Sequence, residues 1–270
     1  MPELPLLLEP EQLERHLAEP ELLIVDMRSP EHYVRGHIPG AVQLNYASLI
    51  QAVPPAMGLM AGLDRLSAVF SAIGLTPDRP VVAYDDEGGG RASRLLWTLD
   101  VLGQRQVSLL DGGLLAWTAE RRPLKPGAVK PTPGHYQAVL ANPAAIADKD
   151  YILSRLGQNE VALLDTRSPA EYQGTEVRAA RGGHIPGAVN LNWTEAMDMS
   201  RQRRFKPAAE LRCRLEALGV TPDKEVILYC QTHHRSAHTY MVLKYLDYPR
   251  VRGYAGAWSE WGNDPTLPVA

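Results

Sequence analysis

Short apolar runs alternate with amphipathic stretches along the second half of the chain. Leu211, Leu215 and Leu218 recur at helical spacing, which predicts a helix over residues 208–218. We expect the apolar runs between such stretches to be strands. Strands that alternate with helices indicate an α/β domain with a mostly parallel sheet. The expected strands are 161–164, 188–191, 226–229 and 249–253.

The same landmarks occur twice in the same order, which indicates two duplicated domains. The separation of the two copies is far too long for a stacked repeat protein. A stretch rich in proline and glycine at 122–133 has the composition of a linker. We therefore expect an N-terminal domain over 1–125, a linker over 126–150 and a C-terminal domain over 151–270. The matched segments are 23–30 with 163–169, 36–42 with 183–189, 74–78 with 219–223, and 111–117 with 255–261.

The charge balance excludes some classes of partner. Lys plus Arg number 28 and Asp plus Glu 31, for a net charge of −3 without a basic stripe, so we expect no nucleic-acid partner. The N-terminal residues have no positively charged region followed by a long apolar one, so we expect no signal peptide and no membrane span. The chain has two cysteines, Cys213 and Cys230. So few thiols do not make a disulfide framework, and a reducing cytoplasm fits best.

One segment combines a candidate nucleophile with a candidate anion-binding loop. The predicted strand 226–229 ends in Tyr-Cys-Gln-Thr-His-His-Arg-Ser, and a helix is predicted from 236 to 246. A loop between a strand end and a helix start turns backbone N–H groups toward one point, where anions bind readily. A cysteine aimed into such a nest, here Cys230, has a depressed pKa and is a good nucleophile. Arg235 adds a fixed positive charge, which suits an oxyanion.

These motifs resemble the tandem-domain rhodaneses, the family of thiosulfate and mercaptopyruvate sulfurtransferases. The resemblance rests on Asp-x-Arg-Ser-Pro-x-x-Tyr, Gly-His-Ile-Pro-Gly-Ala-Val, the Tyr-Cys loop and a terminal Gly-x-Trp segment. It implies two rhodanese-like α/β domains and a persulfide on Cys230. In the first copy Asp85 stands at the cysteine position, so the resemblance implies a catalytically silent N-terminal domain. The implied activity is transfer of a sulfane sulfur from thiosulfate to a thiophilic acceptor such as cyanide.

The loop differs from the usual family sequences, and this leaves the donor open. In this chain the loop is Cys-Gln-Thr-His-His-Arg, with its arginine at the end. Thiosulfate enzymes with two domains instead have Cys-Arg-Lys-Gly-Val-Thr in the corresponding loop. The alternatives are a 3-mercaptopyruvate sulfurtransferase and a persulfide carrier that serves a partner protein. A cysteine phosphatase or arsenate reductase is less favoured, because those loops have one more residue between cysteine and arginine. Either way, we expect a monomer that binds a small anionic sulfur donor and an acceptor, with no cofactor.

Several loop side chains are candidate substrate ligands, each with a plainer alternative. Arg235 is expected to bind the donor oxyanion, rather than a surface carboxylate. Gln231 and Thr232 offer donors or ordinary turn contacts, and His233 and His234 are cations near the anion or solvent-facing loop residues. Arg178 lies in a segment extra to the second copy, 174–181, as a substrate arginine or a solvated one.

Other conspicuous residues have simpler explanations. A metal site from Cys230, His233, His234 and His238 is disfavoured, since adjacent histidines rarely bind one ion, and we expect no metal. Residues that recur in both copies are expected to be structural, and Cys213 is expected to be a bystander on its helix. The recurring residues are His37 and His184, Asp26 and Asp165, and Trp117 and Trp261.

Overall fold

The computed structural model describes residues 4–270, which form two compact units. The first unit comprises the chain up to Ile50, Ala61–Asn142 and Asp198–Phe205. The second comprises Gln51–Met60, Pro143–Met197 and Lys206–Ala270. Each unit thus contains a short segment from the other copy of the repeat.

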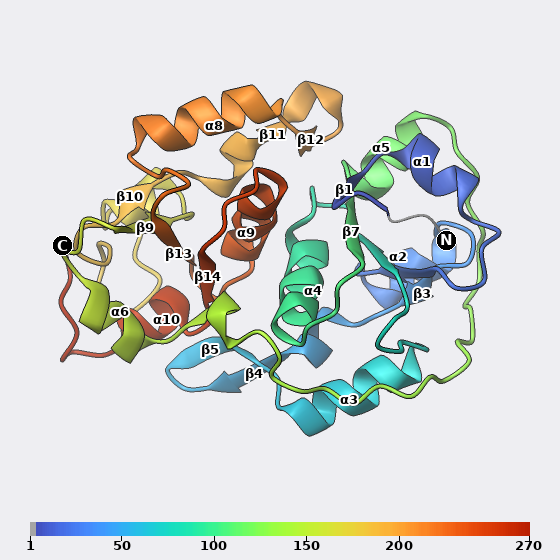
Figure 1. The fold of residues 1–270 in the computed structure, drawn as a ribbon, viewed down its shortest axis with the longest axis horizontal. Helices are drawn as coiled ribbons and strands as arrows, with labels where there is room; N and C mark the ends of the chain where they lie inside the picture. The colour runs from blue at the N-terminus through green and yellow to red at the C-terminus, as the bar shows by residue number, and fades with distance from the viewer. Residues whose placement is uncertain (1–3) are drawn as a thin grey trace. The chain divides into compact units, whose positions relative to one another are not determined.

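The first unit contains a five-stranded sheet in the order β1-β7-β6-β2-β3, with every neighbouring pair parallel. Figure 1 shows this sheet with helices around it. Its strands are β1 (Leu7–Leu8), β2 (Leu23–Asp26), β3 (Val42–Gln43), β6 (Val81–Tyr84) and β7 (Val107–Leu110). The helical elements of this unit are α1 (Pro10–Arg15), α2 (Pro30–Arg35), η1 (Tyr46–Leu49), α3 (Leu63–Ala72), α4 (Gly90–Val101), α5 (Gly113–Ala119) and η4 (Met199–Arg201).

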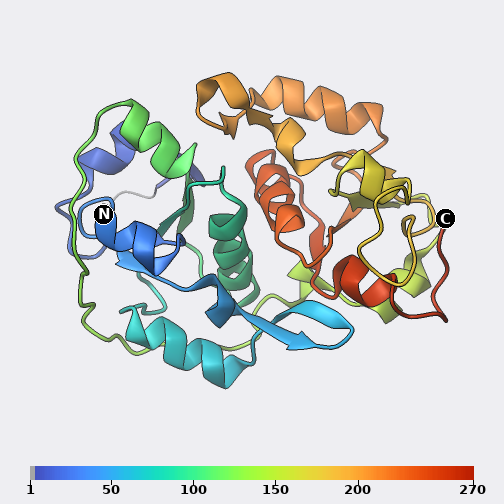
Figure 2. The same ribbon diagram turned by 180° about the vertical axis from the view of Figure 1, so that it is seen from behind.

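The second unit repeats this plan, with strand order β10-β9-β13-β14-β8 and parallel pairs throughout. Seen from behind in Figure 2, α9 lies beside β13 and β14. The strands are β8 (Ile146–Ala147), β9 (Val161–Asp165), β10 (Val189–Asn190), β13 (Glu225–Tyr229) and β14 (Val251–Tyr254). The helical elements are η2 (Pro143–Ala145), α6 (Lys149–Arg155), α7 (Pro169–Tyr172), η3 (Trp193–Ala196), α8 (Ala208–Ala217), α9 (Arg235–Tyr245) and α10 (Ala257–Trp261).

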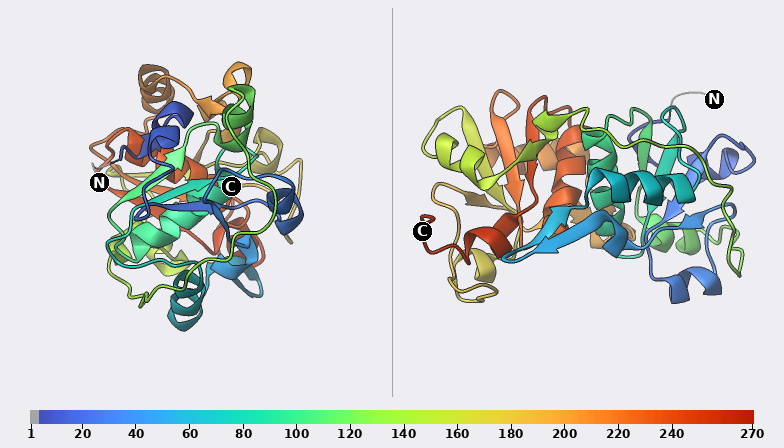
Figure 3. Two further views of the ribbon diagram at one scale, coloured as in Figure 1. Left: turned by 90° about the vertical axis from the view of Figure 1, so that its right-hand side faces the viewer. Right: turned by 90° about the horizontal axis from the view of Figure 1, so that it is seen from below.

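Two small hairpins complete the chain. One pairs β4 (Ile50–Val53) with β5 (Ala56–Met60), and the other pairs β11 (Met197–Asp198) with β12 (Arg204–Phe205). The β4–β5 hairpin comes from the first copy but packs in the second unit, where β5 contacts α10. The right-hand view of Figure 3 shows this contact clearly. The sequence pattern gave no sign of this exchange.

The predicted α/β fold with mostly parallel sheets is confirmed, and the expected strands and helices of the second copy are present within one or two residues of their predicted ends. All five residues of β13 are buried, which explains why this strand is continuously apolar apart from its first residue. Within residues 4–270, no helix has both the length and the apolar character needed to cross a bilayer.

Candidate active site

Cys230 follows β13 directly and lies at the carboxyl edge of the second sheet, where the side chain is 1% exposed. The adjacent α10 fixes the loop, because the N–H groups of Trp258 and Ser259 donate to the carbonyl oxygens of Cys230 and Gln231 at 2.9 and 3.0 Å. With its carbonyls held by α10, the loop can turn N–H groups toward the sulfur. Those of Thr232 and Ser236 do so.

The environment of Cys230 favours its thiolate. Burial raises the pKa of the thiol, but the Arg235 charge, the Ser236 hydroxyl and the N–H groups of Ser236 and Thr232 outweigh burial and leave the pKa below its ordinary value. Ser236 Oγ lies 3.5 Å from Cys230 Sγ and donates to it. A buried thiolate supported by convergent donors is a nucleophile that can keep a transferred sulfur as an anion.

Arg235 is the first residue of α9, and its fork is engaged by a carboxylate that the sequence analysis did not single out. Nη1 and Nη2 of Arg235 donate to Oε2 and Oε1 of Glu171 at 2.6 and 2.8 Å. Arg235 also hydrogen-bonds the sulfur of Cys230. The guanidinium therefore joins the nucleophile to a buried acid.

The two histidines of the loop differ in their surroundings. His233 is fully buried with a positive φ of 56°, and its Nδ1 lies 2.7 Å from Ser236 Oγ. This completes a chain of hydrogen bonds from His233 through Ser236 to Cys230. His234 is half-buried, with its ring 5.8 Å from that of Trp193. The alternative of solvent-facing loop residues is therefore wrong for His233.

Gln231 and Arg178 connect the loop to the extra segment 174–181. Gln231 Nε2 donates to the carbonyl oxygen of Arg178 at 3.0 Å. The Arg178 side chain is 55% exposed, pairs with Glu176, and has its Nε 3.7 Å from Oε1 of Glu171. The structure thus brings the segment against the loop while the guanidinium of Arg178 remains open to solvent.

Thr232 lies beneath the β4–β5 hairpin. A Cβ added to Gly58 would stand 2.2 Å from the carbonyl oxygen of Thr232, so only glycine allows this approach. Ser259 Oγ accepts a hydrogen bond from the N–H of Met57 at 3.1 Å, which ties the same strand to α10. The active loop is therefore covered by a segment from the first copy of the repeat.

The corresponding loop of the first unit is occupied by its own side chain. The Asp85 carboxylate is fully buried and accepts hydrogen bonds from the N–H groups of Glu87, Gly89 and Ala92 at 2.8–3.0 Å. Burial and the nearby Glu87 raise the pKa of Asp85 against the lowering effect of those donors. The nest exists in both copies, but in the first it is filled by the carboxyl group of Asp85 and has no thiol.

The recurring aspartates and histidines make matching structural contacts. Asp165 pairs with Arg167 at 2.6 Å and accepts the N–H of Arg167 at 2.9 Å, and Asp26 repeats both contacts with Arg28. His184 stacks on Tyr172, as His37 does on Tyr33. Trp117 and Trp261 are fully buried, and Cys213 is exposed.

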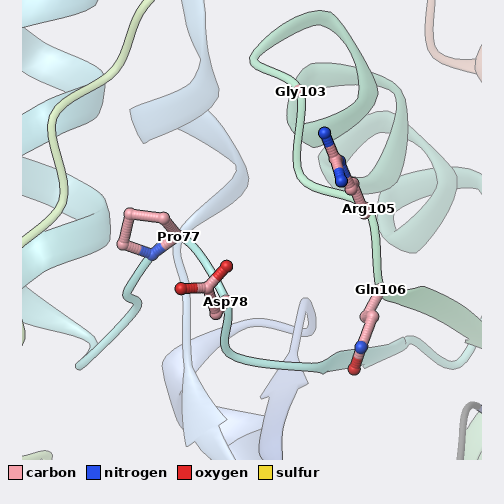
Figure 4. A pocket seen from close by; sticks show the side chains of 5 residues that line it. All are labelled: Pro77, Asp78, Gly103, Arg105 and Gln106. Carbon is pink, nitrogen blue, oxygen red and sulfur yellow. The ribbon is translucent and has the colours of Figure 1, made fainter.

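Over residues 4–270 there is no cluster of histidine, cysteine and carboxylates suited to a metal ion. Figure 4 shows a hollow in the first unit, lined by residues just before β6 and β7. It lies at the amino ends of these strands, the sheet edge opposite Asp85. The lining residues are Pro77, Asp78, Gly103, Arg105 and Gln106.

Comparison with known proteins identifies relatives for nearly the whole chain. The family described as rhodanese-like domain matches twice, at residues 9–120 and 148–264. A thiosulfate sulfurtransferase of Azotobacter vinelandii is 49% identical, with 98% of this chain and 97% of the relative covered. A 3-mercaptopyruvate sulfurtransferase of Escherichia coli strain K12 is 33% identical, with 95% of each covered.

The fold also matches solved structures. An anaerobic ergothioneine biosynthesis enzyme from Chlorobium limicola, in complex with trimethyl histidine, superposes with a TM-score of 0.89 at 23% identity. The match covers 98% of this chain and 69% of that one. At this identity, the likeness concerns the fold alone.

Proposed function

Because the chain belongs to the rhodanese family, we propose that it is a sulfurtransferase that moves the sulfane sulfur of thiosulfate to a thiophilic acceptor such as cyanide. The observation that carries this proposal is the buried Cys230 sulfur, which receives N–H donors and the charge of Arg235. The 49% identity with a thiosulfate sulfurtransferase over the full chain supports thiosulfate as the donor.

The transfer proceeds in two displacements. The Cys230 thiolate attacks the terminal sulfur of thiosulfate, a Cys–S–S bond forms, and the S–S bond of the donor breaks with its electron pair leaving on sulfite. The acceptor then attacks the outer sulfur of the persulfide, and the electron pair of the broken bond restores the thiolate. Thr232 and Ser236 N–H groups stabilise the anionic sulfur in both forms without donating a proton that would end the cycle.

The catalytic work belongs to the C-terminal domain in this proposal. We place the domain over 151–270, the silent domain over 1–125 and a linker over 126–150. The last part of this linker, 143–150, packs with the second unit as η2, β8 and the start of α6. The silence of the first domain follows from Asp85, whose carboxylate cannot attack sulfur and fills its own nest. Arg235, Gln231, Thr232, His233, His234 and Arg178 are the proposed substrate-binding residues.

The proposal includes the oligomeric state, the location and the partners of the enzyme. The two free thiols fit a monomeric cytoplasmic enzyme whose second substrate is a small thiophile or a sulfur-accepting protein. The anion nest and the net charge of −3 fit a small anionic donor rather than a nucleic acid.

A second donor, 3-mercaptopyruvate, is favoured by one contact. Gln231 donates to the backbone carbonyl of Arg178, and the Arg178 guanidinium, with Nε 3.7 Å from Oε1 of Glu171, is a further cation near Arg235. That cation suits a carboxylate-bearing donor.

A donor panel tests the proposal. Thiosulfate and 3-mercaptopyruvate are each supplied with cyanide, and thiocyanate formation is followed at equal enzyme concentration. We expect a higher kcat/KM with thiosulfate. A higher value with 3-mercaptopyruvate would replace the donor, and no thiocyanate from either would overturn the proposed activity.

A further inference from the structure

Glu171 is an acid at a site that must bind an anion. Its side chain is 2% exposed, and its two oxygens accept both Nη groups of Arg235. Burial would raise its pKa, but the hydrogen bonds and charge of Arg235 outweigh burial and lower the pKa of Glu171 to about 2. The carboxylate is therefore ionised at every pH at which the enzyme would work.

The carboxylate is held in place from its own helix as well. Glu171 belongs to the first turn of α7, where the N–H of Ser168 donates to its Oε2 at 3.2 Å and Ser168 Oγ accepts the N–H of Glu171. This reciprocal capping box fixes the side chain independently of Arg235. In the first copy the same position is His32, which is 55% exposed.

A site built only for tight anion binding would leave its guanidinium fork open, since bidentate pairing with the ligand is the strongest contact that arginine makes. Here the fork faces Glu171. The cation still lowers the pKa of the thiol, but a second negative charge stands behind it and repels any oxyanion that approaches. The exposed Arg178, with Nε 3.7 Å from Glu171, offsets only part of this charge.

We propose that Glu171 sets the affinity of the loop for divalent oxyanions, by neutralising Arg235 so that sulfite leaves once its sulfur has been transferred. The inference rests on the proposed function. Before transfer the site contains a thiolate and a doubly charged donor, and afterwards a persulfide anion and doubly charged sulfite. Glu171 weakens the binding of both dianions. The sulfur on Cys230 is still stabilised by the backbone N–H donors.

The plain alternative is that Glu171 only holds Arg235 in place. The two roles predict opposite changes in the affinity for dianions when Glu171 loses its charge but keeps its shape. Glu171→Gln retains the capping box, because glutamine serves it as well as glutamate does. If charge is what matters, the loop becomes more positive and binds dianions more tightly. If holding is what matters, Arg235 loses its partner and binding weakens.

The experiment compares Glu171→Gln with the wild type in two assays. The first gives the KM for thiosulfate and the inhibition constant of sulfite. The second follows alkylation of Cys230 by iodoacetamide against pH, resolved by peptide mapping. We expect both constants to fall by about tenfold, the scale of removing one unit charge that acts across several ångströms of protein. The midpoint of alkylation should move to lower pH.

Glu225→Gln is the matched control. Glu225 is also a buried carboxylate paired with an arginine, Arg252 at 2.6 Å, but it opens β13 at the end of the strand opposite Cys230. Removing this charge should leave the sulfite constant and the alkylation midpoint unchanged. Glu171→Asp supplies a second test that keeps the charge while shortening the reach to Arg235, and it should stay within about twofold of the wild type for sulfite.

Higher constants in Glu171→Gln, or constants equal to those of the wild type, would overturn the inference, as would a large loss of sulfite affinity in Glu171→Asp. These outcomes are distinct from failure of the proposed function. That failure would show as absence of a Cys230 persulfide in the wild type after thiosulfate, measured first on the same preparation.

Discussion

Gly58 lies against the carbonyl oxygen of Thr232, with 2.2 Å between the position of an added Cβ and that oxygen. Gly58 comes from the first copy of the repeat and Thr232 from the active loop of the second. Both belong to the same compact unit. The shape of the loop that presents Cys230 thus depends on a hairpin encoded more than 170 residues earlier.

A methyl group at Gly58 should disturb catalysis. Gly58→Ala forces the Thr232 carbonyl or β5 to move, which displaces N–H donors from the Cys230 sulfur. We expect kcat/KM for thiosulfate to fall about ten- to a hundredfold, as for small misplacements of reacting groups. Gly62→Ala is the control, because a Cβ there meets nothing within 4 Å. Wild-type activity in Gly58→Ala would show that the hairpin does not shape the loop.

Loss of Arg235 should weaken transition-state stabilisation. Arg235→Ala removes the positive charge beside Cys230, and we expect a cost of about 2–4 kcal/mol in kcat/KM with thiosulfate. Arg235→Lys should recover part of this loss, since it restores the charge without the planar fork. Steady-state kinetics with both variants decide the point, and an unchanged kcat/KM in the alanine variant would remove Arg235 from the mechanism.

Ser236 should tune the pH dependence of the nucleophile. Its hydroxyl and N–H both stabilise the Cys230 thiolate, and the serine is also hydrogen-bonded to His233. Ser236→Ala removes the hydroxyl donor, so the pKa of Cys230 should rise and the pH–rate profile should shift to higher pH. The exposed Ser154, whose Oγ donates to Tyr151, offers Ser154→Ala as a control. A profile that does not move would mean that the backbone donors and Arg235 suffice.

The length of the loop should set its chemistry. The terminal sulfur of thiosulfate can enter a narrow nest alone, whereas a phosphoryl centre is surrounded by oxygens. An alanine inserted between Thr232 and His233 displaces Arg235 and Ser236 from Cys230, so sulfur transfer should fall and weak hydrolysis of p-nitrophenyl phosphate should appear. The same insertion between Glu87 and Gly88 tests the silent loop and should leave sulfur transfer unchanged. Efficient phosphatase activity in the wild type would contradict this account.

The sequence was sufficient for the nucleophile and for four of the five strands of the second sheet; the fifth, β8, lies within the predicted linker. β13 is an apolar run bounded by polar residues, and its position fixes Cys230 at the carboxyl edge of a parallel sheet. The repeated motifs likewise indicated two copies of one fold. These features depend on local sequence pattern and on the topology of parallel sheets, and both can be predicted from the sequence.

The residues that contact the Cys230 loop could not be predicted from the sequence in the same way. Glu171 carries a capping-box signal, which predicts a helix start and says nothing of Arg235, 64 residues later. The β4–β5 hairpin has a single polar side chain, Gln51, and its sequence does not indicate in which unit it packs. His233 is buried and has a left-handed backbone conformation, which histidine adopts more readily than most residues but which its local sequence does not require. Such contacts are set by tertiary packing.

The mass of the protein after exposure to thiosulfate tests the central claim most directly. The wild type is incubated with thiosulfate, freed of excess donor, and analysed by intact mass spectrometry and peptide mapping. We predict one added sulfur, on Cys230, and none in Cys230→Ser, because an alcohol neither attacks as a thiolate nor retains a persulfide. An added sulfur on the exposed Cys213, or an unchanged label in Cys230→Ser, would contradict the account.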